Sequence, residues 1–164
     1  MESTILTKTQ IDQKIKRIAY QIYECNLNQK SIVLAGITDN GYIFAKKIQK
    51  VLAEISPLEI VLCEVIIDKK NPLNPVQTSL NIADYKNKSL VLVDDVLNSG
   101  TTLMYAIKHF LEVPLSQFKT AVLVDRNHKK YPVKADFKGI SLSTSLQEHV
   151  QVSFTAKDSK AYLA

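Results

Sequence analysis

The sequence predicts an α/β fold in which a mainly parallel sheet is flanked by helices on both faces. Apolar runs of strand length alternate along the chain with segments of helical periodicity. The runs are continuous rather than alternating, which is typical of strands buried on both faces of a sheet. The chain has 164 residues, of which 46% are hydrophobic and 23% charged, as in ordinary globular proteins. We therefore expect one domain spanning residues 1–164.

The first half of the chain contains two helical patterns and two apolar runs. Thr7 or Thr9 can cap the first helix, and apolar residues then recur at helical spacing. These apolar residues are Ile11, Ile15, Ile18, Ala19 and Ile22. The other elements expected here are a strand over residues 31–37, a turn over 36–41, a helix over 42–53 and a strand over 59–67.

The second half predicts an exposed loop followed by further strands and one helix. Residues 68–75 include two lysines, two prolines and two asparagines, a composition typical of a loop. The elements expected after it are a short edge strand over residues 79–83, strands over 89–93, 118–124, 135–142 and 150–154, and a helix over 101–111. Parallel sheets bind ligands at the carboxyl ends of their strands. The turns expected at those ends are residues 36–41, 94–102 and 125–131.

Charge and cysteine content narrow the class of protein. The net charge of +5 suits a phosphorylated small molecule or RNA, and equally a solvated basic surface. Cys25 and Cys63 lie far apart, so we expect no disulfide framework and a cytoplasmic setting. The N-terminal residues lack the features of a signal peptide, and no apolar run approaches the ~20 residues that span a bilayer, so no membrane association is expected. The three histidines are scattered and predict no zinc site.

The most informative segment joins an apolar strand to a helix through a turn of small polar residues. The strand ends at two carboxylates, Asp94 and Asp95. The turn and the start of the helix follow, with Asn98, Ser99, Gly100, Thr101 and Thr102. Successive backbone N–H groups in such a turn can converge on an anion, reinforced by the positive end of the helix. Gly100 lets the chain approach a phosphate without hindrance from a Cβ. The segment therefore predicts a phosphate site.

The two carboxylates have a separate role. Because successive strand residues point in opposite directions, one of Asp94 and Asp95 can accept hydrogen bonds from sugar hydroxyls while the other lies behind it. Mg²⁺ suits a carboxylate together with a pyrophosphate, so we expect the pair to hold this ion indirectly. The alternative is a strand-turn-helix joint in which the aspartates cap the turn. The sequence contains no Walker A loop.

Residues 90–107 resemble the 5-phosphoribosyl pyrophosphate (PRPP) binding motif of the type I phosphoribosyltransferase family. Residues 121–139 are similar to one branch of that family, the pyrimidine-operon attenuator proteins that also act as uracil phosphoribosyltransferases. The turn at 36–41 and the first helix fit as well. The resemblance implies the fold of this family, with a small hood beside the sheet. It also implies displacement of pyrophosphate from C1 of the ribose by a base nitrogen.

The resemblance further implies roles for individual residues. Asp94 and Asp95 would hold the ribose hydroxyls, and the turn from Asn98 to Thr102 would hold the 5′-phosphate. The implied pyrophosphate contacts are Thr38, Asp39, Asn40 and Gly41. The implied base contacts are Arg126, Phe137 and the backbone of Lys138. Catalytic contributions would come from Asp94, Asp95, Asn98, Lys69 and Lys70.

Plainer interpretations stand beside several of these roles. Arg126 could pair with Asp125 or Asp136, Phe137 could belong to the core, and the two lysines of the 68–75 loop could be solvated.

The chain also departs from the attenuator branch at the implied site. Asn40 and Thr101 stand where that branch usually has arginines. The 68–75 loop is shorter than the mobile catalytic loop of relatives and lacks its tyrosine-arginine-acid run, which predicts slow or absent transfer unless a neighbouring subunit completes the site. Asn98 stands where relatives acting on 6-oxopurines have an aspartate, which favours a uracil-like base.

Three functions are therefore in contention. The leading hypothesis is a Mg²⁺-dependent phosphoribosyltransferase that acts on a pyrimidine and forms a homodimer, as family members commonly pair. The second is a nucleotide-sensing regulator that binds RNA without catalysis, RNA being the less favoured partner. The third is a protein that holds PRPP or a nucleotide without reacting it. The basic residues that could contact RNA are Lys14, Lys16, Arg17, Lys46, Lys47 and Lys50.

Overall fold

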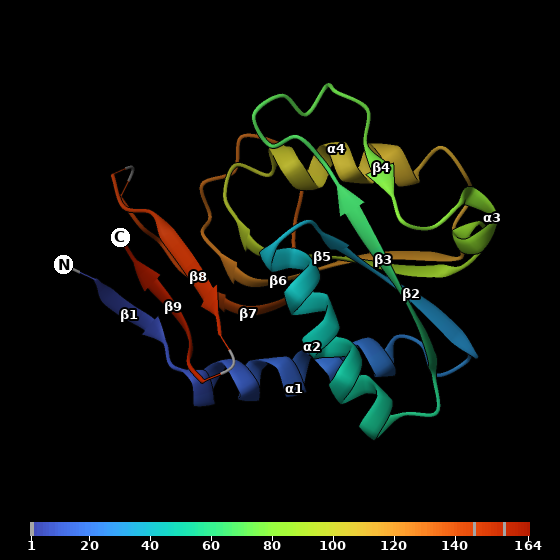
Figure 1. Cartoon of the computed structure of the whole chain (residues 1–164), viewed down its shortest axis with the longest axis horizontal. Coiled ribbons are helices and arrows are strands. Elements are labelled where there is room, and N and C mark those ends of the chain that lie inside the picture. The colour runs from blue at the N-terminus through green and yellow to red at the C-terminus, as the bar shows by residue number, and fades with distance from the viewer. Residues whose placement is uncertain (1, 146, 156) are drawn as a thin grey trace.

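The computed structural model describes residues 2–145, 147–155 and 157–164, and its main sheet has the strand order β4-β3-β2-β5-β6-β7 (Figure 1). Five of these strands run parallel, and β4 at the edge pairs antiparallel with β3. The mainly parallel sheet predicted from the sequence is confirmed. The strands are β2 (Ser31–Ile37), β3 (Glu59–Ile66), β4 (Gln77–Thr78), β5 (Ser89–Leu97), β6 (Gln117–Asp125) and β7 (Phe137–Ser141).

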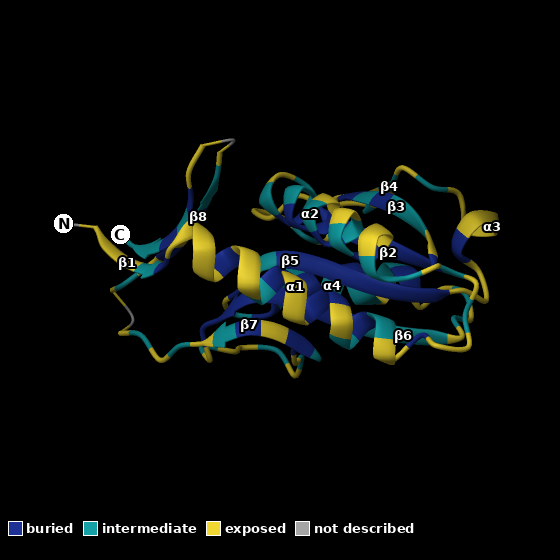
Figure 2. Ribbon diagram, turned by 90° about the horizontal axis from the view of Figure 1, so that it is seen from below, coloured by how far each residue is buried: buried dark blue, intermediate teal, exposed yellow. Residues whose placement is uncertain are grey.

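Helices cover both faces of the sheet, as predicted. On one face, α1 and α2 share a buried apolar cluster with side chains of β2, β5 and β6. On the other face, α4 and the short α3 cover a second cluster. Figure 2 shows the central strand β5 mostly in the dark blue of buried residues. The helices are α1 (Lys8–Glu24), α2 (Asn40–Ile55), α3 (Ile82–Tyr85) and α4 (Thr101–Phe110). No helix within the described ranges is long and apolar enough to cross a membrane.

The start of α1 follows from its sequence. Thr7 is the N-cap: its hydroxyl accepts a hydrogen bond from the N–H of Gln10 at 3.3 Å, and the Gln10 side chain accepts one from the N–H of Thr7 at 2.9 Å. This reciprocal pair satisfies N–H groups that the first turn of a helix leaves without partners. Thr7, rather than Thr9, is therefore the cap, and the five predicted apolar residues of this helix are all buried.

A smaller antiparallel sheet stands beside the main sheet, and we call it the hood. Its strands are β1 (Ser3–Leu6), β9 (Ser159–Leu163) and β8 (Val150–Phe154), in the order β1-β9-β8. The two chain ends lie together at this sheet (Figure 1). Buried side chains of all three strands, Leu6, Val152 and Ala161, join the apolar cluster that α1 and α2 also enter. The hood is thereby fixed to the helical layer on one face of the main sheet.

The prediction of an edge strand over residues 79–83 is wrong. The edge strand β4 ends at Thr78, and α3 begins soon after it. Asn81 caps α3 in a capping box with Asp84, so the polar residues of this stretch close a helical turn instead of continuing a strand.

The strand predicted over residues 89–93 is longer in the structure. Its parallel pairing with β6 continues through Val96 and Leu97, so β5 ends four residues later than the apolar run does. Asp94 and Asp95 therefore lie within the strand, and the sheet holds their main chain in place.

Candidate functional site

β2 and β5 are neighbours in the main sheet, and the strand that follows each of them is added on the side away from the other. From β2 the sheet continues through β3 to β4, and from β5 it continues through β6 to β7. The crevice outside the carboxyl ends of two such strands is the usual ligand site of an open α/β sheet. Two of the predicted turns, residues 36–41 and 94–102, meet at this point.

Asp94 and Asp95 have different surroundings. Asp94 is only 3% exposed, and its Oδ1 accepts a hydrogen bond from the N–H of Asp95 at 2.9 Å. Asp95 is half-buried; its Oδ1 accepts from the N–H of Val96 at 2.9 Å, and its Oδ2 accepts from Asn40 Nδ2 at 3.2 Å. Asp94 is thus the carboxylate that lies behind, and Asp95 is the one that faces outward.

The environment of this pair suits a bound cation. Burial raises the pKa of the Asp94 carboxyl well above its ordinary value of 3.8, the charge of Asp95 raises it further, and Lys69 opposes the rise. Within the described ranges, no group of three or more His, Cys, Asp and Glu side chains could hold a metal ion. Two adjacent carboxylates still fit Mg²⁺ when pyrophosphate oxygens and water complete its shell.

The turn after β5 leads directly into α4. Gly100 is the N-cap of α4 and has a φ of 86°, in the left-handed region that favours glycine. A Cβ on Gly100 would lie 2.4 Å from Cγ1 of Val133, so no larger residue fits without movement. The hydroxyls of Ser99 and Thr101 are 2.8 Å apart, and the Ser99 carbonyl accepts a hydrogen bond from the N–H of Lys130 at 2.7 Å. The turn is therefore fixed at the positive end of a helix.

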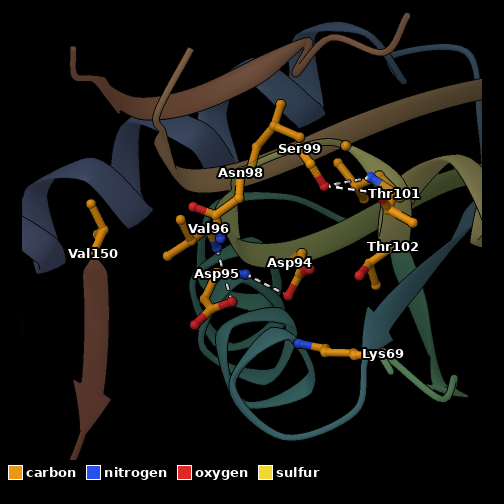
Figure 3. A pocket seen from close by; sticks show the side chains of 12 residues that line it. Lys69, Asp94, Asp95, Val96, Asn98, Ser99, Thr101, Thr102 and Val150 are labelled. Carbon is orange, nitrogen blue, oxygen red and sulfur yellow. Dashed lines mark hydrogen bonds between the residues drawn. The ribbon is translucent and has the colours of Figure 1, made fainter. Parts of the chain in front are cut away.

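A cavity of about 230 Å³ opens where the predicted phosphate turn and the acid pair meet (Figure 3). In Figure 3, the Lys69 side chain extends towards Asp94 and Asp95 from the opposite side of the cavity. The space that a ligand needs is open and is not filled by side chains. The lining residues are Lys69, Asp94, Asp95, Val96, Leu97, Asn98, Ser99, Gly100, Thr101, Thr102, Leu103 and Val150.

The turn after β2 adjoins the acid pair. Thr38 is tied to β3, because its hydroxyl donates to the Val65 carbonyl at 2.6 Å. Asp39 has a φ of 69°, a strained conformation for a residue with a side chain. Gly41 lets the start of α2 approach β5 closely, since a Cβ there would lie 2.9 Å from Oδ1 of Asp94. These three residues, with Asn40, stand beside the cavity and are not among its lining residues.

Arg126 is buried, and its guanidinium is bound to the protein. Nη1 donates to Oδ1 of Asn98 at 3.2 Å and Nε donates to the hydroxyl of Thr144 at 2.6 Å. Nη2 donates to the main-chain carbonyls of Ser145, at 3.0 Å, and of Glu148. Neither of the ion pairs considered from the sequence, with Asp125 or with Asp136, is present among the described residues.

The structure does not bring Phe137 and Lys138 to the cavity. Phe137 is buried in the apolar cluster beneath α1, and the Lys138 carbonyl accepts a hydrogen bond from Arg17 of α1 at 2.9 Å. Both residues lie at the start of β7, paired with the middle of β6, whereas the site is at the other end of these strands. Val150, which the sequence did not single out, lines the cavity instead. We therefore correct the base contacts implied for Phe137 and Lys138: Phe137 is a core residue, its plainer interpretation.

The 68–75 loop is short and hydrogen-bonded within itself. Oδ1 of Asp68 accepts from the N–H groups of Lys70 and Asn71, at 2.9 and 3.1 Å, and Oδ2 accepts from Asn74 Nδ2 at 3.0 Å. These hydrogen bonds hold the pKa of the Asp68 carboxyl below its ordinary value, and the bond from the N–H of Asn71 has the largest effect. The loop places Lys69 on the cavity wall, and Lys70 is not among the lining residues.

The fold and the cavity define the class of protein: an α/β protein with an open cavity at the carboxyl ends of β2 and β5. A family model described as the phosphoribosyl transferase domain matches residues 2–157. The chain belongs to this phosphoribosyltransferase family.

Individual relatives agree with this assignment. The bifunctional protein PyrR of Streptococcus mutans is 36% identical over 151 residues, which cover 89% of this chain and 85% of that protein. The bifunctional protein PyrR of Pediococcus pentosaceus is 33% identical over 162 residues, which cover 93% and 92%. Among solved structures, the hypoxanthine phosphoribosyltransferase of Trypanosoma cruzi superposes with a TM-score of 0.76 at 17% identity, covering 90% of this chain and 84% of that one. The fold implied by the sequence is thus confirmed.

Proposed function

We propose that this chain is a Mg²⁺-dependent phosphoribosyltransferase that moves the phosphoribosyl group of PRPP to a pyrimidine such as uracil. The observation that carries the proposal is the open cavity whose wall runs from the acid pair to the start of α4. It offers hydroxyl and main-chain donors for a phosphate at one end and carboxylate acceptors for ribose hydroxyls at the other. Membership of the phosphoribosyltransferase family and the 33% and 36% identity to PyrR proteins support it.

Each part of the cavity has a role in the proposed reaction. Ser99, Thr101 and Thr102 bind the 5′-phosphate, and Asp95 binds the ribose hydroxyls. A base nitrogen forms the new bond to C1 of the ribose, and the electron pair of the breaking C–O bond leaves with pyrophosphate. The proton of the base nitrogen passes to water. When bound, Mg²⁺ neutralises charge on the departing pyrophosphate, and Asp94 and Asp95 are the residues that would hold it through its water shell.

Two further residues support departure of pyrophosphate in this proposal. Lys69 extends towards the acid pair from the opposite wall and supplies a positive charge near the leaving group. Asp39 carries the strained conformation at the start of α2, where the turn after β2 would contact pyrophosphate. Thr38, Asn40 and Gly41 complete that turn.

The test is a transfer assay on the purified chain. PRPP consumption and nucleotide formation are measured with uracil, cytosine, hypoxanthine and guanine, each with and without Mg²⁺. We expect UMP to form from uracil and to disappear when Mg²⁺ is chelated. Tight PRPP binding with no transfer to any base would reduce the function to the binding of PRPP or a nucleotide without catalysis.

Assembly is a separate part of the proposal. We propose a homodimer in the cytoplasm, in line with the family, and sedimentation equilibrium measures the mass directly. A monomer at concentrations that sustain full activity would remove the dimer from the proposal.

A second function, RNA binding by a regulator, is favoured by the placement of basic residues. α1 and α2 lie side by side on one face of the sheet, and Lys16, Lys46 and Lys50 are exposed on them. Arg17 is engaged with carbonyls of β7 and is less available. Filter binding of a pyrimidine-operon leader RNA at increasing salt tests this function, since phosphate contacts weaken steeply with salt. Retention that is absent, or insensitive to salt, would remove it.

A further inference from the structure

Arg126 connects two segments that border the cavity. Its main-chain N–H donates to the Leu97 carbonyl at 3.0 Å, so the residue is attached to the end of β5. Its guanidinium binds Asn98 on one side and Thr144, Ser145 and Glu148 on the other. Glu148 lies two residues before Val150, the first residue of β8, which lines the cavity. The Arg126 side chain therefore links Asn98 to the residues that precede Val150.

The donor inventory of arginine limits what Arg126 can do. A guanidinium has five N–H groups and no acceptor, and four hydrogen bonds to the protein are present here. The side chain is also buried, with 7% of the residue exposed. Too few N–H groups remain for a paired contact with a base. The charge therefore acts on the ligand through the groups that Arg126 holds.

The bond to Asn98 fixes the orientation of an amide on the cavity wall. Because a guanidinium only donates, the carbonyl oxygen of the Asn98 amide must face it, which leaves Nδ2 as the end that can point elsewhere. Among the described residues, Nδ2 of Asn98 has no acceptor. Asn98 also lines the cavity between Asp95 and Ser99. The cavity wall therefore carries a hydrogen-bond donor at Asn98.

We propose that Arg126 is a positioning residue that builds the base side of the cavity by bracing Asn98 against the segment that carries Val150. The inference rests on the proposed function, because it assigns the base to this side of the cavity. The inference distinguishes two possible roles of Arg126, direct contact with the base and positioning of the residues around it. A charge that contacts the base directly can be replaced by lysine, whereas a side chain that holds four separate partners needs the planar fork of arginine.

The experiment compares Arg126→Lys with the wild type for a nucleotide and for ribose 5-phosphate, which has no base. Calorimetry gives the dissociation constant of ribose 5-phosphate and of the tightest-binding nucleotide among UMP, CMP, GMP and IMP. We expect Arg126→Lys to weaken nucleotide binding at least tenfold and ribose 5-phosphate binding by less than twofold. Arg17→Lys is the matched control, because Arg17 also clasps two main-chain carbonyls, but on β7 away from the cavity.

The ratio of the two dissociation constants decides the outcome. A change in this ratio of less than fivefold in Arg126→Lys overturns the inference, and so does a nucleotide that binds no more tightly than ribose 5-phosphate to the wild type. Binding of neither ligand to the wild type contradicts the proposed function instead. If Arg126→Lys does not fold, Thr144→Val removes one partner of the brace and leaves the arginine. It should then shift the same ratio at least threefold, and a smaller shift overturns the inference.

Discussion

At the scale of single residues, Asp94 and Asp95 differ although they are adjacent in the sequence. The main chain of β5 holds both, but Asp94 is almost fully buried and Asp95 is half-buried. Asp95 also receives hydrogen bonds from Val96 and Asn40, which fix its carboxylate at the edge of the cavity. The two acids should therefore respond differently to the same substitution by asparagine.

Asp95→Asn should weaken PRPP binding. The change removes the charge that strengthens hydrogen bonds from the ribose hydroxyls, and a charged hydrogen bond contributes about 1.5–3 kcal/mol, which is roughly a tenfold to hundredfold change in affinity. Calorimetry with PRPP and Mg²⁺ measures it. Asp12→Asn, in an exposed pair with Lys8, is the control. Unchanged affinity in Asp95→Asn would show that the ribose contact is assigned to the wrong residue.

Asp94→Asn should stabilise the fold without ligand while abolishing the use of Mg²⁺-PRPP. Because the folded state raises the pKa of Asp94 above 3.8, it retains a proton that the unfolded chain releases, and wild-type stability falls as the pH rises above about 4. At pH 7 the free energy of unfolding of the variant should therefore exceed that of the wild type. The gap should vanish below pH 4. Urea denaturation between pH 3.5 and 8 measures it, and a gap that does not depend on pH would contradict this assignment.

At the scale of elements, the 68–75 loop has a defined shape despite its loop-like composition. Asp68 collects three hydrogen bonds from the residues that follow it. Of its two lysines, Lys69 is among the described residues that line the cavity and Lys70 is not.

Lys69→Ala should lower kcat/KM for PRPP about tenfold, which corresponds to about 1.4 kcal/mol of transition-state stabilisation. The lost group is a positive charge near the departing pyrophosphate. Lys70→Ala, which removes the same charge one residue later, is the matched control and should change kcat/KM by less than twofold. Steady-state kinetics with uracil measure both variants. Equal losses in the two would mean that the loop acts through its overall charge.

Most elements could be predicted from the sequence, and those that were missed share a cause. The strand at Val150–Phe154 and the apolar face of α1 are as predicted, because their patterns are set by local burial. β1 and β9 were missed. Among the described residues, β1 is short and pairs only with a strand more than 150 residues away, and β9, which pairs with both β1 and β8, is also short. The error at residues 79–83 could have been avoided from the sequence, because the spacing of Asn81 and Asp84 is that of a capping box and indicates the start of a helix.

The candidate site divides in the same way. The acid pair and the phosphate turn form one continuous segment, so the sequence alone could bring them together. The base side depends on which residue of a later strand reaches the cavity, and that is fixed by register. The pairing of Phe137 with Ala121 places Phe137 below the site, and an aromatic residue beside an apolar strand gives no sign of this. The partners of Arg126 lie 18 to 28 residues away along the chain, a distance at which spacing carries no information.

At the scale of the whole molecule, the cavity lies where the hood meets the main sheet. The main sheet supplies the acid pair and the phosphate turn, and the hood supplies Val150. One side chain of α2 also joins the two parts: Asn40 Nδ2 donates to Oδ2 of Asp95 at 3.2 Å and to the Val152 carbonyl of β8 at 2.8 Å. The position of the hood and the orientation of the Asp95 carboxylate are therefore coupled through Asn40.

Asn40→Ala should loosen the hood and weaken PRPP binding together. Each hydrogen bond removed leaves a partly buried acceptor without its partner, at a cost of about 1–3 kcal/mol. Amide exchange in β8 should therefore quicken about tenfold or more, while exchange in β2 and β5 stays as it was. Gln49→Ala is the matched control, because Gln49 lies on the same helix and its amide also donates to a main-chain carbonyl, that of Ile60 at 3.3 Å. If β8 exchanges at the wild-type rate in Asn40→Ala, the hood is held by its apolar contacts alone, and Asn40 serves Asp95 without linking the two sheets.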